Sequence, residues 1–220
     1  MPNRQERFEN RRDAGRQLAN ALAGKHYDVV LSLPRGGVPV AYEVAMRLQL
    51  PLDVLVVRKL GAPGHAEFGI GAVVDGDPPQ VVMNSQTVKM LQVPERYIEE
   101  EIQRQKREIT RRRHAYRGEQ APVNVSGRRV ILVDDGIATG GTAKAAARAM
   151  RQAGAATVTL AVPVAPASTL GELAGDVDDV ICLATPEPFT AVGEHYQDFT
   201  QTSDDEVIGL LQAAREASNE

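Results

Sequence analysis

The chain has 220 residues, of which 43% are hydrophobic and 25% charged, and its formal net charge at neutral pH is -4. These values are typical of a globular protein and exclude a disordered or membrane-embedded chain. The small negative charge gives no overall attraction to nucleic acid or anionic lipid. We therefore expect neither as a partner, and any phosphate site must be local. A chain of this length can form one full α/β core, so we expect a single domain over residues 1–220.

The N-terminus points to a cytoplasmic protein. It is charged from the start and has no apolar core of a signal peptide. No apolar stretch approaches the roughly 20 residues that cross a bilayer. Cys182 is the single cysteine and has no partner for an internal disulfide, which fits a reducing compartment.

The first half of the chain alternates helices and strands. We expect a helix over 4–23 that ends at Gly24, a strand over 28–33, a helix over 38–48 and a strand over 52–57. Between the first strand and the second helix stands Pro34-Arg35-Gly36-Gly37, called here the PRGG loop. Glycines and a basic residue before a helix N-terminus are typical of an anion site. The alternative is a tight turn with a surface arginine.

A flexible loop and hairpin are predicted at about 58–84. Arg58 and Lys59 end the second strand, and the glycine-rich stretch 58–71 predicts a mobile cover. Residues 71–74 and 80–83 are expected to pair as a hairpin. We interpret His65 and Glu67 as exposed loop residues, with proton transfer or metal contact as the alternative.

A helical insertion is predicted at about 85–118, with helices over 85–91 and 94–116. Its segment 99–117 has glutamates and arginines at ion-pair spacing, such as Glu108 and Arg112. The run Arg111 to Arg113 could bind RNA or phosphate. We favour a solvated helix face whose charges pair with one another.

Val130 to Thr142, called here the signature segment, is the most informative part of the chain. Its apolar start, Val130 to Val133, predicts a strand buried on both faces. Asp134 and Asp135 follow at the strand's carboxyl end, where ligands bind in open α/β sheets. Residues 138–142 are small and precede an alanine-rich helix, so their N–H groups can approach an anion closely. The residues therefore predict a site for a sugar phosphate.

Two further strands, over 157–164 and 177–183, flank a helix over 167–174. Strands and helices in alternation predict an open, mostly parallel twisted sheet with helices on both faces. The stretch 185–202 then gathers aromatic and acidic residues in a loop-like segment, although aromatics make up only 4% of the chain.

The signature segment resembles that of the type I phosphoribosyltransferases, which have a Rossmann-like fold and bind 5-phosphoribosyl 1-pyrophosphate (PRPP). The resemblance implies that Asp134 and Asp135 hold the ribose hydroxyls. It also assigns Arg35, Gly36 and Gly37 to pyrophosphate, with a cis peptide between Pro34 and Arg35. It also implies that the 5-phosphate is bound by the loop Ala138, Thr139, Gly140, Gly141 and Thr142.

The same resemblance assigns further roles outside these loops. Arg58 and Lys59 would touch pyrophosphate when the flexible loop closes. The region 185–202 would form a small hood, in which Phe189 stacks on the base and Asp198 makes an indirect contact with Mg2+. Tyr196 is a weaker base-binding candidate, and a hydrophobic cluster is the alternative for Phe189.

The resemblance implies an enzyme of nucleotide salvage that transfers the phosphoribosyl group of PRPP to a nitrogenous base and releases pyrophosphate. Mg2+ is the implied cofactor, and a homodimer is the assembly considered. Alternatives are a PRPP-binding regulator without catalysis and a hydrolase or phosphorylase of a ribose phosphate compound. Where hypoxanthine-guanine members have an aspartate this chain has Ala138, and no lysine follows Lys144. A 6-oxopurine is thus disfavoured, and the acceptor stays open.

Overall fold

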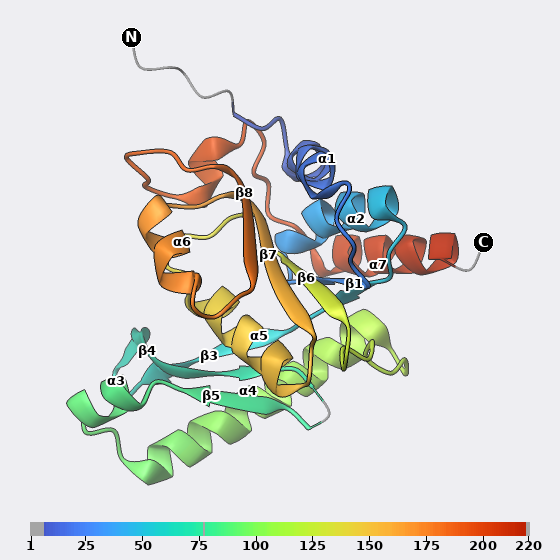
Figure 1. The fold of residues 1–220 in the computed structure, drawn as a ribbon. Coiled ribbons are helices and arrows are strands. Elements are labelled where there is room, and N and C mark those ends of the chain that lie inside the picture. The colour runs from blue at the N-terminus through green and yellow to red at the C-terminus, as the bar shows by residue number, and fades with distance from the viewer. Residues whose placement is uncertain (1–6, 77, 219–220) are drawn as a thin grey trace.

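A five-stranded parallel sheet forms the centre of the molecule in the computed structural model, which describes residues 7–76 and 78–218 and, at 65–68, the backbone alone. Its strand order is β2-β1-β6-β7-β8 (Figure 1). The strands are β1 Val29–Ser32, β2 Leu52–Val54, β6 Arg129–Val133, β7 Thr157–Val164 and β8 Asp179–Ala184. The open parallel sheet predicted from the alternation of elements is confirmed.

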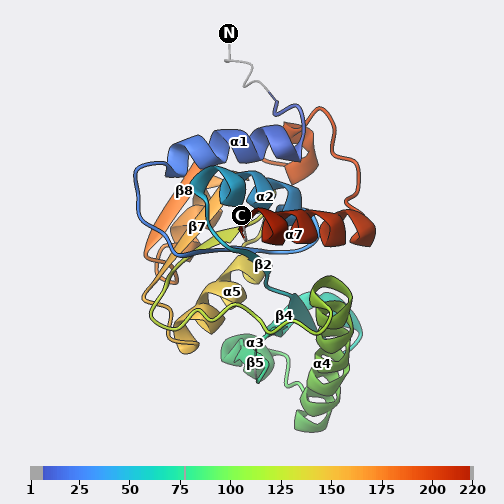
Figure 2. The same ribbon diagram turned by 90° about the vertical axis from the view of Figure 1, so that its right-hand side faces the viewer.

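Helices cover both faces of this sheet. One face carries α1 Arg11–Leu22, α2 Gly37–Leu48 and α7 Asp204–Ser218, which lie together in Figure 2. The other face carries α5 Gly141–Gln152 and α6 Ala167–Leu173. In β6, Ile131 and Val133 pack into the first layer, whereas Val130 and Leu132 pack into the second. Burial on both faces explains why this strand is an unbroken apolar run.

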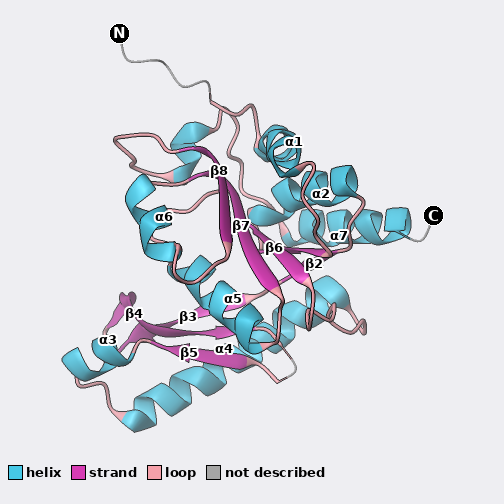
Figure 3. Ribbon diagram, in the orientation of Figure 1, coloured by secondary structure: helices cyan, strands magenta, loops and turns pink. Residues whose placement is uncertain are grey.

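A second, antiparallel sheet lies below the first (Figures 1 and 3) and packs with two helices. It consists of β3 Val57–Ala62, β4 His65–Val74 and β5 Gln80–Met83, and the helices are α3 Ser85–Met90 and α4 Glu95–Arg117. The predicted hairpin is confirmed, since Gly71 stands opposite Met83 and Val74 opposite Gln80. No described helix combines the length and apolarity that a membrane span requires.

The prediction of a glycine-rich loop over 58–71 was wrong, because most of this stretch is paired strand. β3 and β4 pair from Val57 opposite Val74 to Ala62 opposite His65. The apolar side chains of Leu60 and Ile70 are fully buried, which favours a sheet over a mobile loop. A Cβ at Gly71 would lie 2.5 Å from the carbonyl oxygen of Val82, so this glycine permits close strand packing.

Two other differences from the sequence prediction concern the second strand and the C-terminal helix. The strand expected over 52–57 is divided, because β2 belongs to the parallel sheet and β3 to the antiparallel one. Helix α7 was not predicted, although Val207, Leu211 and Ala214 form a helical stripe that packs into the core. In the arginine-rich part of α4 the charges pair with one another, as we interpreted from the sequence: Arg111 and Arg112 both pair with Glu108.

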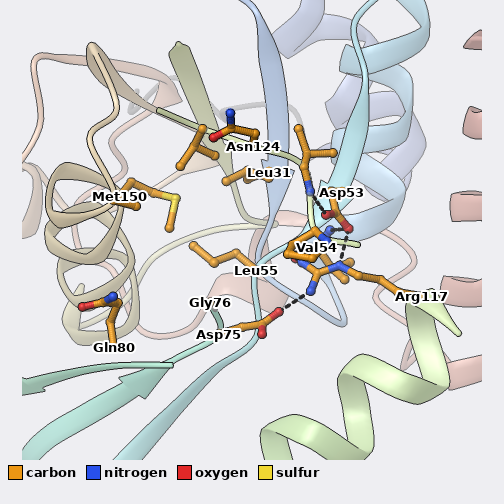
Figure 4. Close-up of a pocket in the computed structure, with 14 residues that line it drawn as sticks. Leu31, Asp53, Val54, Leu55, Asp75, Gly76, Gln80, Arg117, Asn124 and Met150 are labelled. Atoms are coloured by element: carbon orange, nitrogen blue, oxygen red, sulfur yellow. Dashed lines mark hydrogen bonds and ion pairs between the residues drawn. The ribbon is translucent and has the colours of Figure 1, made fainter. Parts of the chain in front are cut away.

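A buried guanidinium joins the two sheets (Figure 4). Arg117, the last residue of α4, donates to Asp53 on β2 at 2.7 Å and to Asp75 after β4 at 2.5 Å, and also to the carbonyl oxygen of Val54. The three charged side chains are at most 5% exposed. Burial raises the pKa of Asp75, whose Oδ1 has no partner among the described atoms. A cavity of about 290 Å³ borders this junction. Without Arg117, two buried carboxylates would be uncompensated.

We expect Arg117→Met to lower the free energy of unfolding by about 3–5 kcal/mol, because it removes one partner from a buried ion cluster. Urea unfolding followed by circular dichroism measures this change. Arg111→Met is the matched control on the same helix, since Arg111 pairs with Glu108 but is 62% exposed, and it should cost about 1 kcal/mol or less. Equal losses in the two variants would contradict the importance of burial at Arg117.

Candidate active site

The candidate site lies where the strand order reverses, between β1 and β6. From this point the chain runs outward to β2 on one side and to β7 and β8 on the other. Ser32 stands opposite Val133, so the loops that follow these residues emerge side by side. In open α/β sheets this position outside the carboxyl ends of the strands is where ligands bind. The PRGG loop and the signature segment both reach it.

The loop over 138–142 has the form of an anion cradle. Gly140 has a left-handed backbone with φ 72°, and a Cβ there would lie 2.9 Å from the side chain of Thr169, so only glycine fits. Thr169 on α6 donates to the carbonyl oxygen of Ala138 at 2.7 Å and supports the loop. No described side chain caps the start of α5, which leaves its first N–H groups available to an anion.

The PRGG loop lies directly against the two aspartates. Its Pro34–Arg35 peptide is cis, as predicted. A Cβ at Gly36 would lie 2.0 Å from Oδ2 of Asp135, and one at Gly37 would lie 2.9 Å from the carbonyl oxygen of Val133. A side chain at Gly36 would therefore displace the carboxylate of Asp135, and one at Gly37 would displace the strand backbone. The structure thus brings the predicted pyrophosphate loop and the predicted ribose carboxylates into contact.

Arg35 lies near Asp204 and Tyr116, two residues that no sequence motif indicated. Its Nη1 lies 3.8 Å from Oδ1 of Asp204, at the start of α7. The same oxygen accepts a hydrogen bond from the hydroxyl of Tyr116 at 2.7 Å. Burial and this hydrogen bond raise the pKa of Tyr116 to about 12, so the phenol stays protonated. The guanidinium of Arg35 remains one-third exposed and can reach a ligand.

Asp135 is held from the N-terminal helix, a second feature that no motif indicated. Nε of Arg11 donates to Oδ2 of Asp135 at 2.8 Å, and the two side chains are 11% and 14% exposed. The hydroxyl of Tyr196 donates to the backbone oxygen of Asp135 at 2.5 Å. Both the side chain and the backbone of this aspartate are therefore fixed by residues far away in the sequence.

The aspartate pair is electrostatically strained. Burial raises the pKa of Asp134, and the adjacent charge of Asp135 raises it further. Burial also raises the pKa of Asp135, but the hydrogen bond and charge of Arg11 act in the opposite direction. The carboxylate nearest Arg11 is thus the better stabilised anion.

The predicted hood over 185–202 pairs with the N-terminal segment. Phe8 forms an isolated β-bridge with Tyr196. The side chain of Tyr196 is buried, with 2% of the residue exposed, and is part of a hydrophobic cluster. Phe189 stacks on His195 at a centroid distance of 5.2 Å and packs into the same hydrophobic cluster. Oδ1 of Asp198 accepts hydrogen bonds from Thr200, which lower its pKa. Base stacking by Phe189 and metal contact by Asp198 stay predictions.

Arg58 and Lys59 lie on β3, in the antiparallel sheet. Arg58 donates to Gln105 on α4 at 3.0 Å, and Gln105 in turn donates to the buried Glu101 at 2.8 Å. Both cations line a cavity of about 450 Å³ between β3 and α4. Their contact with pyrophosphate stays a prediction. The side chains of His65 and Glu67 lie outside the described residues. Across the described chain, no group of three or more metal-ligating side chains is arranged around a common point.

Comparison with known proteins agrees with this geometry. Residues 4–198 match the family model described as "Phosphoribosyl transferase domain". A Mycobacterium tuberculosis protein named "Putative phosphoribosyl transferase Rv0571c" is 49% identical over 210 residues, which is 94% of this chain and 47% of that protein. The chain therefore spans about half the length of the curated relatives it matches.

A solved structure resembles the whole fold. The crystal structure of TT1426 from Thermus thermophilus shares 42% identity at a TM-score of 0.83, covering 94% of this chain and 98% of that one. The resemblance first seen in the signature segment thus extends over nearly the whole chain. The chain belongs to the phosphoribosyl transferase domain family.

Proposed function

We propose that this protein is an enzyme that transfers the 5-phosphoribosyl group of PRPP to a nitrogenous base and releases pyrophosphate. The contact between Gly36 and the carboxylate of Asp135 supports this proposal best. PRPP bears its pyrophosphate on C1 of the ribose, next to the hydroxyl-bearing carbons. A donor site for PRPP therefore needs its ribose-binding and pyrophosphate-binding loops in direct contact, and the contact between the PRGG loop and Asp135 meets this requirement.

In the proposed reaction, the bond between C1 and the pyrophosphate oxygen breaks and its electron pair leaves with pyrophosphate. A ring nitrogen of the base forms the new bond to C1, and the proton that the base loses goes to solvent. The loop over 138–142 would hold the 5-phosphate, while Asp134 and Asp135 accept hydrogen bonds from the ribose hydroxyls. Because positive charge develops at the ribose, these anions also stabilise the transition state. No covalent nucleophile is required.

Mg2+ fits the oxygen donors of the proposed site. When bound, it would neutralise charge on the departing pyrophosphate. The carboxylates of Asp134 and Asp135 would be the nearest protein donors, and Asp198, whose Oδ2 has no partner among the described residues, would make an indirect contact. A few carboxylates beside substrate oxygens suit an ion that keeps several of its waters.

The acceptor is proposed only as a class. The loop has Ala138 where hypoxanthine-guanine members have an aspartate, so a 6-oxopurine is disfavoured. A free base as acceptor supports a role in nucleotide salvage, and the single cysteine supports a cytoplasmic location. The buried ion pairs of Arg117 with Asp53 and Asp75 join the two sheets and so support a single domain over 1–220.

We expect pyrophosphate release when the protein is incubated with PRPP, Mg2+ and one member of a panel of purines, pyrimidines and other bases. Asp134→Asn and Asp135→Asn should each lower kcat/KM about ten- to hundredfold, because each weakens a charge-assisted hydrogen bond to the ribose.

Asp179→Asn is the matched control. Asp178 and Asp179 are another adjacent pair, but they stand at the opposite end of the sheet, where Asp179 pairs with Lys25 at the surface. This variant should keep full activity. Tight PRPP binding without turnover on any base would favour the regulator, and absence of PRPP binding would refute both functions.

We also expect Gly36→Ala to weaken PRPP binding and turnover together, since the new methyl group must displace the carboxylate of Asp135. Titration calorimetry with PRPP measures the effect on binding. Gly209→Ala, on the surface of α7 with no atom within 4 Å of its ideal Cβ, is the control. Normal PRPP affinity in Gly36→Ala would show that the contact between the two loops is not needed for binding.

A further inference from the structure

Arg11 contacts three parts of the candidate site at once. Its Nε donates to Asp135 at 2.8 Å, and its Nη1 donates to the carbonyl oxygen of Thr200 at 2.7 Å. Cζ of the guanidinium also lies over the ring of Phe199, 3.9 Å from the ring centroid. One side chain from the first turn of α1 therefore joins the ribose carboxylate to the hood.

We propose that Arg11 is a positioning residue for PRPP: it holds the carboxylate of Asp135 toward the ribose hydroxyls and fixes the hood against this donor site. The proposal rests on the proposed function, because it assigns Arg11 a task in the binding of that donor.

The arrangement leaves Asp135 available to a ligand. Arg11 engages only Oδ2, and Oδ1 has no hydrogen-bond partner among the described residues. Oδ2 also lies close to Gly36, where an ideal Cβ would stand 2.0 Å from it, so the PRGG loop limits the space in which the carboxylate can move. Arg11 and Gly36 together restrict this carboxylate to one orientation, with Oδ1 free to accept from a hydroxyl.

Arg11 is itself held in place. Asn10 caps α1 by accepting from the N–H of Asp13, which fixes the helix start. The adjacent segment pairs with the hood, since Asp198 donates its N–H to the carbonyl oxygen of Glu9 at 2.9 Å. The side chain of Arg11 is 11% exposed and its guanidinium lies over an aromatic ring while donating two hydrogen bonds, a combination that a lysine cannot reproduce.

Only arginine can make both hydrogen bonds together. Its planar fork presents Nε and Nη1 in fixed directions toward Asp135 and Thr200. A lysine would keep the charge near Asp135 but would lose the second contact or the stacking. The proposal therefore predicts a graded series of variants.

The test measures binding of PRPP and, separately, of inorganic pyrophosphate by titration calorimetry in the presence of Mg2+. Arg11→Met should weaken PRPP binding about ten- to hundredfold, because a charge-assisted hydrogen bond to a largely buried carboxylate is lost. Arg11→Lys should be intermediate. Pyrophosphate binding should fall much less than PRPP binding in both, since pyrophosphate has no ribose hydroxyl for Asp135 to hold.

Arg12→Met is the matched control. Arg12 is the next residue on α1 and has the same kinds of partner: it donates to Glu43 at 2.6 Å and lies over the ring of Tyr42 at 5.5 Å. Its side chain is 55% exposed and does not contact the site. This variant should bind PRPP and pyrophosphate like the wild type. Thermal melting of every variant shows whether it is folded.

Each result decides the proposal. A selective loss of PRPP affinity in Arg11→Met supports it, and the same loss in Arg11→Lys supports it if the methionine variant does not fold. Unchanged or tighter PRPP binding overturns it, as does an equal loss for PRPP and pyrophosphate. If the wild type binds pyrophosphate but not PRPP, the proposed function itself fails, whatever the variants do.

Discussion

The close approach of the PRGG loop to Asp134 and Asp135 is the constraint on which the rest of the site depends. It follows from the pairing of β1 with β6, which places Ser32 opposite Val133. At this separation a Cβ on Gly36 or Gly37 would meet the aspartate carboxylate or the strand backbone. The loop must therefore be built from residues without side chains at these two positions. The same closeness lets one small ligand touch both loops.

This closeness creates an electrostatic problem for a phosphate-binding site. Two unit charges of one sign about 4 Å apart repel by about 4 kcal/mol at an effective dielectric constant of about 20. The two aspartates repel each other, and both would repel the anionic groups of a phosphorylated ligand. Arg11 offsets part of this charge at Asp135, and the available N–H groups at the start of α5 favour an anion nearby. The negative groups proposed to bind hydroxyls and the N–H groups proposed to bind phosphate thus lie in one part of the molecule.

The sequence predicted the parts of the molecule that depend on short stretches of chain. The apolar run before Asp134, the small residues over 138–142 and the glycines of the PRGG loop each have a local physical reason, and the structure has them as predicted. Contacts between distant segments were not predictable in this way. Arg11 and Asp135 are separated by 124 positions, and an arginine on a charged helix gives no sign of its partner. The glycines over 58–71 led to a wrong prediction for a related reason. Glycine is favoured both where strands pack closely and where a loop is mobile.

The same distinction between local stretches and long-range contacts explains why the sequence predicted PRPP as the donor but left the acceptor base open. The proposed donor site consists of strand ends and helix starts of the parallel sheet, whose geometry the fold imposes. The hood is assembled from the N-terminal segment and residues 185–202, which meet through the bridge between Phe8 and Tyr196 and the contact of Arg11 with Thr200. Among the described residues of this region, 7–10 and 185–202, the one regular element is a short 3₁₀ turn at Val192–His195. Its surface is therefore set by individual side chains such as Phe189 and His195. Under the proposed function, substitutions there would change the preference for the acceptor base while the sheet and its two loops stay the same.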